Sequence, residues 1–262
     1  MTEGREQTVR RPVALITGVG RTRGIGAGVA RRLALAGWDI VFTYFSPYDE
    51  RMPWGGEPSA NEVIAAELRA AGAQALAIEA DLADPTSASQ LFDGALHAFV
   101  SIEALVLCHC ESVASEIRDT TLESFDRHFA VNARASWLLI REFARRAEVS
   151  GGGEDPRRRI VALTSDHTVG NLPYGASKAA LDRITLAAAH ELAHLGVRAN
   201  VVNPGPVDTG WMTDAVRAAG AEQTPLGRNG TPADTADLVN FLCSAEGGWI
   251  NGQLIKSNGG YA

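Results

Sequence analysis

Short apolar runs rich in valine, isoleucine and leucine alternate with longer amphipathic stretches along almost the whole chain. This alternation is typical of parallel strands that are buried on both faces and joined by crossover helices. The pattern therefore predicts an α/β fold, a doubly wound parallel sheet of about seven strands with helices on both faces. The expected strands are 13–17, 39–45, 74–79, 103–109, 159–164, 197–202 and 252–256, and the expected helices are 25–36, 59–71, 86–99, 121–147, 174–195 and 232–244.

Nothing in the chain looks like an interdomain linker, so we expect one domain over residues 12–262 after a flexible tail at 1–11. Two long loops are expected at 46–58, rich in proline and glycine, and at 204–230. In an open parallel sheet, ligands bind beyond the carboxyl ends of the strands, where both loops would lie. The second loop is the candidate for a lid over the substrate.

Charge and composition exclude several classes of function. A net charge of −7 and a pI near 5.4 argue against nonspecific binding to nucleic acid or to anionic membranes. The dense basic cluster Arg157-Arg158-Arg159 precedes an apolar strand and is expected at an exposed loop edge. No apolar run approaches the roughly 20 residues that span a bilayer, and the N-terminus has no apolar signal-peptide core. Three cysteines make no disulfide framework, so we expect a cytoplasmic protein.

A glycine-rich turn follows the first expected strand and precedes a helical pattern. It reads Gly18-Val19-Gly20-Arg21-Thr22-Arg23-Gly24-Ile25-Gly26. Glycines here allow a tight turn and a close approach of backbone N–H groups to a pyrophosphate at a helix N-terminus. The turn therefore predicts dinucleotide binding.

The choice of cofactor can be argued from charge. A ribose 2′-hydroxyl favours an acidic partner about 20 residues past the turn, but the second strand ends in Thr43-Tyr44-Phe45-Ser46, without a carboxylate. Arg21 and Arg23 lie within the turn, where a 2′-phosphate could meet them. We therefore expect NADP(H) rather than NAD(H). In the alternative, these arginines face solvent and Asp49 or Glu50 returns to the ribose.

Tyr174 and Lys178 place a phenol and an ammonium one helical turn apart. A free tyrosine has a pKa of roughly 10, and a neighbouring cation stabilises the phenolate. Lys178 is one of only two lysines among 24 lysine and arginine residues. Lysine is a compact point charge whose pKa can move, unlike that of arginine. The pair therefore suggests a proton donor assisted by a cation, whereas in isolation it could be a solvated helix face.

The ordered set of glycine turn, Asp81, Asn132, Ser165, Tyr174-x-x-x-Lys178 and Asn203-Pro204-Gly205 resembles the short-chain dehydrogenase/reductase family, from Val13 to the C-terminus. The resemblance implies a single Rossmann-like domain that reduces a carbonyl, or oxidises an alcohol, with a nicotinamide cofactor. It also implies that Tyr174 is the general acid in reduction and that Lys178 lowers its pKa and holds the nicotinamide ribose. Ser165 would polarise the substrate oxygen, and Asn132 would anchor a water that links Lys178 to solvent.

The same resemblance implies the cofactor contacts. Asp81 would hydrogen-bond the adenine, Pro204-Gly205 would lie against the nicotinamide, and Thr209 would meet its carboxamide or the phosphates. Trp211 and Met212 would belong to a mobile lid over Gly210 to Arg228, or would pack its underside. The full set of expected cofactor-binding residues is Gly18, Gly20, Arg21, Arg23, Gly24, Ile25, Gly26, Asp81, Leu82, Tyr174, Lys178, Pro204, Gly205, Val207 and Thr209.

The chain departs from the family pattern at three places. Gly18 and Gly24 are further apart than the family's first two key glycines, so the pyrophosphate contacts cannot be assigned glycine by glycine. The segment Leu107-Cys108-His109-Cys110 replaces the Asn-Asn-Ala-Gly that ties the sheet together in the family. If this segment is a strand, His109 points to the opposite face from both cysteines, so the three side chains cannot easily bind one metal ion. Ser165 lies nine residues before Tyr174 instead of about a dozen. This short loop leaves Asp166, His167 or Thr168 as alternatives that line the pocket.

Two other functions compete with the reductase. His190-Glu191-Leu192-Ala193-His194 matches the H-E-x-x-H of zinc peptidases, but no histidine follows as a third ligand. We therefore expect no metal. A non-catalytic NADP(H)-binding sensor or scaffold is the second alternative, which the altered Leu107–Cys110 segment and the short serine loop keep open.

By analogy with the family, the long apolar helices 121–147 and 174–195 predict a homodimer or homotetramer. The expected substrate is a small carbonyl or alcohol, such as a 3-oxoacyl thioester or a secondary-metabolite ketone.

Overall fold

The computed structural model describes residues 10–149 and 157–261, so most of the expected tail lies outside the described residues. In the described part, seven parallel strands form one sheet in the order β3-β2-β1-β4-β5-β6-β7. This doubly wound order confirms the predicted fold class.

The strands are β1 (Val13–Thr17), β2 (Asp39–Tyr44), β3 (Ala75–Glu79), β4 (Ala104–Leu107), β5 (Arg158–Leu163), β6 (Val197–Asn203) and β7 (Leu254–Lys256). The α-helices are α1 (Ile25–Leu35), α2 (Ser46–Glu50), α3 (Ala60–Ala70), α4 (Ser87–Ala98), α5 (Leu122–His128), α6 (Ala135–Val149), α7 (Leu172–Glu191), α8 (Asp214–Gln223) and α9 (Pro232–Cys243), with the shorter turns η1 (Phe129–Arg134), η2 (Ala193–Leu195) and η3 (Glu246–Trp249).

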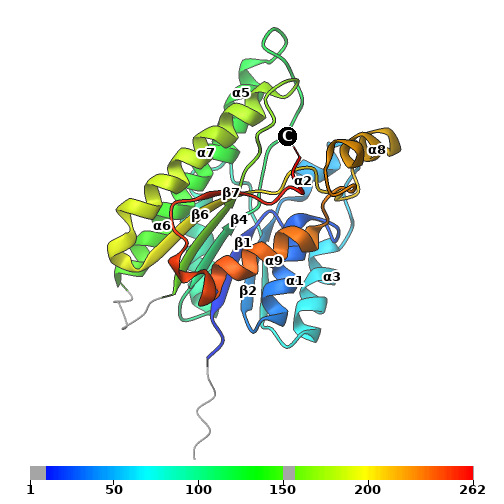
Figure 1. The fold of residues 1–262 in the computed structure, drawn as a ribbon. Helices are drawn as coiled ribbons and strands as arrows, with labels where there is room; N and C mark the ends of the chain where they lie inside the picture. The colour runs from blue at the N-terminus through cyan, green and yellow to red at the C-terminus, as the bar shows by residue number, and fades with distance from the viewer. Residues whose placement is uncertain (1–9, 150–156, 262) are drawn as a thin grey trace, which may run out of the picture.

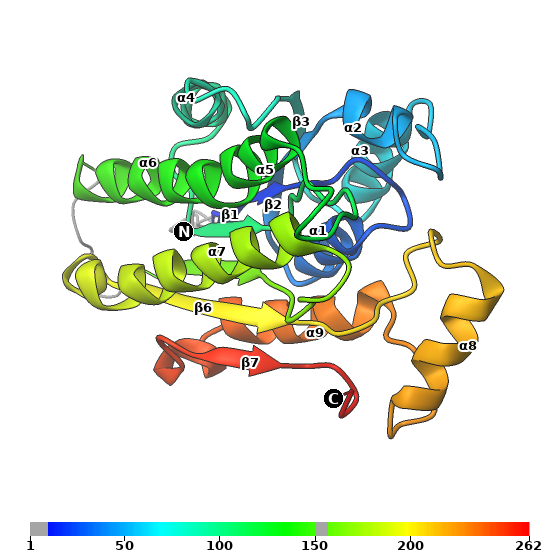
Figure 2. The same ribbon diagram turned by 90° about the horizontal axis from the view of Figure 1, so that it is seen from above.

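Helices cover both faces of the sheet, with α1 and α9 on one face and α6 and α7 on the other (Figure 1). Figure 2 shows the same layers from above. Successive side chains of a strand point to opposite faces. In β1, Ala14 and Ile16 pack with α1, α3 and α9, whereas Val13 and Leu15 pack with α4, α6 and α7. Burial on both faces explains why the strands are apolar without alternation.

The expected helix 121–147 is divided into three elements. α5 ends at His128, a π-helical turn (η1) spans Phe129–Arg134, and α6 continues from Ala135. A π turn adds one residue to a helix without ending it, so the apolar periodicity of the sequence does not reveal it.

The two expected loops also contain helices. α2 begins at Ser46 with Pro47 in its first turn, where a missing N–H costs no helical hydrogen bond. α8 lies within 204–230, and its N-cap Thr213 accepts a hydrogen bond from the backbone N–H of Val216. The prediction of structureless loops was therefore wrong for these two stretches.

The basic cluster before β5 is not an exposed loop edge. Arg158 and Arg159 belong to β5 and are buried, with 8% and 5% of their surface exposed. Their guanidinium groups donate to backbone carbonyls, as Arg158 does to Leu195 O at 2.7 Å. Only Arg157 of the three is exposed.

Among the described helices, none combines the length and the apolar character needed to cross a membrane. The carboxyl ends of β1, β4 and β5 meet at one edge of the sheet. The residues that follow them carry the candidate site.

Candidate active site

Tyr174 and Lys178 lie on the first turns of α7, as their spacing predicts. Pro173 occupies the first turn of this helix. The Lys178 Nζ lies 5.9 Å from the centroid of the Tyr174 ring. Lys178 is buried, with 2% of its surface exposed, and donates to Leu163 O at 2.9 Å and to His109 O at 3.3 Å. Two backbone carbonyls therefore fix the ammonium beneath the phenol.

Ser165 follows β5 by two residues and reaches Tyr174 despite the short loop between them. A side-chain hydrogen bond joins Ser165 to Tyr174. The Ser165 Oγ also accepts the backbone N–H of His167 at 3.1 Å. The structure therefore brings together three of the four predicted catalytic residues: Ser165, Tyr174 and Lys178.

The electrostatic balance at Tyr174 differs from the prediction. Burial raises its pKa above the ordinary value, the Cys110 thiol also raises it, and the hydrogen bond with Ser165 lowers it. Burial likewise lowers the pKa of Lys178, whereas Cys110 and Cys108 raise it. The lowered tyrosine pKa expected from the sequence is wrong for this structure, because loss of water around the phenolate dominates.

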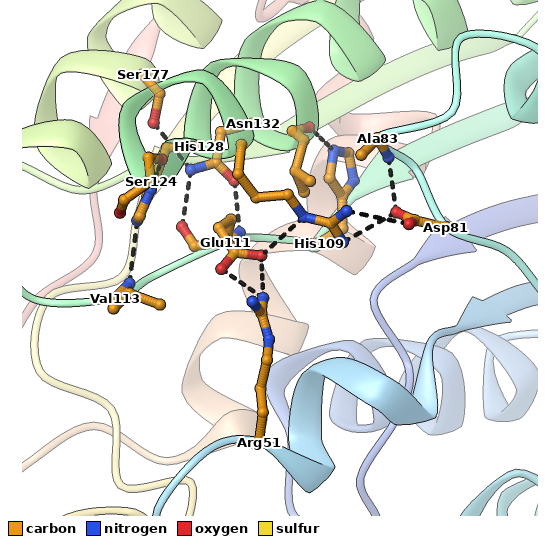
Figure 3. A network of polar contacts seen from close by, with 12 residues as sticks. Arg51, Asp81, Ala83, His109, Glu111, Val113, Ser124, His128, Asn132 and Ser177 are labelled. Carbon is orange, nitrogen blue, oxygen red and sulfur yellow. Dashed lines mark hydrogen bonds and ion pairs between the residues drawn. The ribbon is translucent and has the colours of Figure 1, made fainter. Parts of the chain in front are cut away.

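Asn132, the fourth predicted residue, lies in η1 and is fully buried. Its Oδ1 accepts the backbone N–H of Glu111 at 2.7 Å. Its Nδ2 donates to Glu111 O at 2.9 Å and to Ser177 Oγ at 2.8 Å (Figure 3). The side chain of Asn132 is thus held against the segment after β4 and against α7.

The glycine-rich turn has the geometry of an anion cradle. Gly18 has φ +73°, and a Cβ on it would lie 2.6 Å from the Cα of His109. A Cβ on Gly26 would lie 2.7 Å from Gly18 O. Gly24 is the N-cap of α1 and has no side chain to satisfy the first N–H groups of the helix. These free N–H groups and the helix dipole fit a pyrophosphate.

Arg21 and Arg23 lie against the start of segment 204–230. Arg21 donates to Thr209 O at 3.3 Å and to Thr209 Oγ1 at 3.2 Å. It also pairs with Asp49 at 3.5 Å and lies over the Trp54 ring at 5.0 Å. A Cβ on Gly210 would lie 3.3 Å from the guanidinium of Arg23. Arg21 therefore links the glycine turn to Thr209 and to the segment after β2.

The expected adenine contacts follow β3. Asp81 accepts two hydrogen bonds from Arg127, both at 3.1 Å, and one from the backbone N–H of Ala83 at 2.9 Å (Figure 3). Leu82 is buried, with 6% exposed, and packs in the core. The arginine partner of Asp81 is not visible in the sequence pattern, because it is 46 residues away.

Segment 204–230 leaves the end of β6 and folds back on itself. Gly205 has φ +65°, and a Cβ there would lie 2.4 Å from the Cβ of Asn258. Val207 is buried and forms a bridge with Gly230, while Pro204 is buried directly after β6. Within the segment, Met212 is 7% exposed and Trp211 is 47% exposed. Met212 therefore packs inward, as the alternative predicted, and Trp211 does not.

The segment after β4 is not a strand, because β4 ends at Leu107. The Nδ1 of His109 lies 2.6 Å from Thr17 Oγ1, and its Nε2 lies 3.0 Å from Val131 O. His109 therefore joins β1, the end of β4 and η1. Burial lowers the pKa of His109 to about 3 and raises that of Cys108 to about 12, so both side chains are neutral.

The sequence patterns that suggested metal sites are not assembled as such. α7 ends at Glu191, so His190 and His194 do not share one α-helical face. Over residues 10–149 and 157–261, no group of three or more His, Cys, Asp or Glu side chains is placed to hold a metal ion.

A cavity of about 400 Å³ lies beside Ser165. Asp166, His167 and Thr168, the alternatives for pocket lining, all contribute to its wall. On α7 the wall includes Leu172 and Gly175, on either side of Tyr174, but not Tyr174 itself. Asp166 is held at the rim by an ion pair with Lys256, at 3.1 Å.

Several residues near the site were missed in the sequence. Tyr48 and Arg51 come from the presumed loop 46–58, and the Tyr48 hydroxyl interacts electrostatically with Cys110 and Tyr174. Glu111 is buried with 2% exposed and pairs with Arg51. Its one signal in the sequence is its place, immediately after the segment Leu107-Cys108-His109-Cys110 that departs from the family pattern.

Comparison with known proteins agrees with this arrangement. The sequence model of the family described as enoyl-(acyl carrier protein) reductase matches residues 18–262. The chain is 35% identical over 257 residues to the uncharacterized oxidoreductase YjdA of Bacillus subtilis, covering 95% of this chain and 96% of the relative. The chain belongs to the short-chain dehydrogenase/reductase family.

Two further members of this oxidoreductase family are informative. The NADPH-dependent aldehyde reductase-like protein of Arabidopsis thaliana chloroplasts is 35% identical over 266 residues, covering 95% of this chain and 93% of the relative. The crystal structure of a short-chain dehydrogenase from Burkholderia cenocepacia in complex with NADP has a TM-score of 0.83 and 33% identity, covering 95% of this chain and 97% of that one. The predicted fold and family are confirmed.

Proposed function

We propose that this protein is an NADPH-dependent carbonyl reductase, which also oxidises the corresponding alcohol, with Tyr174 as the proton donor. The observation that carries the proposal is the convergence of Ser165, Tyr174 and Lys178 where β5 meets α7. Ser165 holds the substrate oxygen beside the phenol, and Tyr174 donates a proton to it as negative charge develops. Lys178, fixed by two carbonyls, supplies the positive charge that favours this transfer.

The glycine turn and the N-terminus of α1 would hold the pyrophosphate of the cofactor. NADPH, when bound, supplies the hydride. The preference for NADPH is supported by Arg21 and Arg23, by the absence of a carboxylate at the end of β2, and by the NADP-binding relatives. Asp49, the alternative ribose ligand, is already paired with Arg21.

Asn132 anchors the water through which Lys178 is supplied with protons from solvent. Its amide is fixed by Glu111 and Ser177, so its position relative to α7 is rigid. Because Asn132 is held rigidly, the Lys178 ammonium and the water path that reaches it keep a fixed relative position. Segment 204–230 closes the substrate side, with Thr209 and Pro204 nearest the cofactor.

The substrate is an aldehyde or ketone, for which we propose a 3-oxoacyl thioester or a secondary-metabolite ketone. Turnover is tested by following NADPH oxidation with a panel of aldehydes, cyclic ketones and 3-oxoacyl thioesters, with NADH in parallel. Turnover with NADPH on at least one carbonyl supports the proposal. Tight NADPH binding without turnover across the panel would instead identify a sensor or scaffold.

We also propose a cytoplasmic homodimer or homotetramer. The lining of a surface cavity includes the apolar Phe129, Ala133, Trp137 and Ile184 beside the charged Asp126 and Arg134, and Trp137 is 47% exposed. Packing of a second copy over α6 and α7 would cover these apolar side chains. A monomeric mass by light scattering at micromolar concentration would refute the assembly.

A further inference from the structure

Glu111 is a buried carboxylate for which the proposed chemistry has no direct use. It follows Cys110 at the carboxyl edge of the sheet, and 2% of its surface is exposed. A buried charge is costly unless it is paired and hydrogen-bonded. Its partners therefore show what it stabilises.

The backbone N–H and the backbone carbonyl of Glu111 are both hydrogen-bonded to the side chain of Asn132. Its N–H donates to the Oδ1 of Asn132 at 2.7 Å, and its carbonyl accepts from the Nδ2 of Asn132 at 2.9 Å. The remaining Nδ2 proton of Asn132 goes to Ser177 Oγ at 2.8 Å. The orientation of the Asn132 amide is thus set by the position of the Glu111 backbone and of α7 (Figure 3).

The carboxylate of Glu111 is held by arginines from two other elements. Arg51, directly after α2, donates to both of its oxygens, and the Nε of Arg127 on α5 lies 3.5 Å from Oε2. Arg127 in turn forms its two hydrogen bonds with Asp81 after β3. These contacts connect Asp81 through Arg127 to Glu111 and then to Asn132. Figure 3 labels Asp81, Glu111 and Asn132 in this network.

We propose that Glu111 is a positioning residue for the reaction. The ion pairs of its carboxylate with Arg51 and Arg127 fix the position of the Glu111 backbone, which orients the amide of Asn132. The inference rests on the proposed function, in which Asn132 supports proton supply to Lys178. It adds that the buried carboxylate of Glu111 connects α2 and the expected adenine contact, Asp81, to the catalytic residue Asn132.

A second buried glutamate in the same chain provides a matched control. Glu142 on α6 is also 2% exposed and is also surrounded by arginines, Arg141, Arg145 and Arg146. These three partners all lie on α6, and Arg146 also pairs with Asp93 on α4, so none of them belongs to the candidate site. Loss of either carboxylate removes a buried ion-pair cluster, but only loss of Glu111 releases Asn132.

The test compares Glu111→Gln, Glu142→Gln, Asn132→Ala and the double variant Glu111→Gln with Asn132→Ala. The kcat for carbonyl reduction is measured per NADPH-binding site, titrated by fluorescence, so that unfolded protein does not count. We expect Glu111→Gln to lower kcat ten- to a hundred-fold, the range for a misplaced neighbour of the chemistry. We expect Glu142→Gln to stay within about two-fold. In the Asn132→Ala background, Glu111→Gln should have little further effect, because both act through one amide.

The outcomes separate the two proposals. Equal kcat for wild type and Glu111→Gln, equal losses for the two glutamines, or additive losses in the double variant would overturn the positioning role alone. A wild-type protein that binds NADPH but reduces no carbonyl would overturn the proposed function and this role with it. If Glu111→Gln does not fold, Arg51→Gln removes the ion pair with Glu111 by changing a more exposed residue. Arg145→Gln, which removes an ion pair with Glu142, is then the control.

Discussion

Replacement of His109 by glutamine is expected to flatten the dependence of stability on acid pH. The imidazole is 6% exposed and bonded through Nδ1 to Thr17 and through Nε2 to Val131 O. Burial first, and then the charge of Lys178, lower its pKa from 6.5 to about 3. Between these two values the unfolded chain binds a proton at His109 that the folded chain does not.

The expected size follows from that one proton. A difference of one bound proton changes the free energy of unfolding by about 1.4 kcal/mol per pH unit. Because the folded pKa is the lower one, the contribution of His109 is complete above the unfolded pKa and is lost as the pH falls toward 3. From neutral pH to roughly pH 4.5, the loss amounts to about 2.5 kcal/mol.

The assay is urea unfolding of wild type and His109→Gln at several pH values from roughly 7 to 4.5. The pKa of buried His128 is also lowered, so both proteins retain some slope. The difference between the two slopes isolates His109. If the free energy of unfolding changes with pH equally in the two proteins, His109 is not the neutral side chain that joins β1, β4 and η1.

Three further variants test separate parts of the site. Gly18→Ala places a side chain at φ +73° and against the His109 backbone, so its Tm should fall by at least about 5 °C; an unchanged Tm contradicts the close approach. Arg21→Gln should raise the KM for NADPH about ten-fold or more and leave that for NADH nearly unchanged; an equal rise with both cofactors would place Arg21 away from the 2′-phosphate. Ser165→Ala should lower kcat and move the pH profile upward, because the Ser165 hydrogen bond lowers the pKa of Tyr174; a downward move would argue against that bond.

The sheet and most helices could be predicted from the sequence because their apolar periodicity is local. β1 and β2, for example, begin at Val13 and Asp39, where the pattern placed them. The π turn around Asn132 could not be predicted, because it leaves the apolar periodicity of the helix unbroken, and the partners of Asn132, Glu111 and Ser177, lie 21 and 45 residues away. α2 was missed because five residues, one of them proline, give too short a periodic signal.

The candidate site was predictable where residues act through short spacings. Tyr174 and Lys178 are one helical turn apart, and their geometry follows from the helix alone. The pKa of Tyr174 was misjudged, because burial of its hydroxyl depends on the whole fold. The partners Arg51 of Glu111 and Arg127 of Asp81 were out of reach, since the pairs are 60 and 46 residues apart.

The proton transfer from Tyr174 is tested most directly by Tyr174→Phe. NADPH binding and carbonyl reduction are measured on the same preparation, so that loss of the hydroxyl is separated from loss of the fold. Removal of a general acid is expected to lower kcat by a factor of roughly 10² to 10⁴, with NADPH affinity nearly unchanged. A phenylalanine variant that still reduces the carbonyl within a few-fold of the wild-type rate would contradict the assignment of Tyr174 as the proton donor.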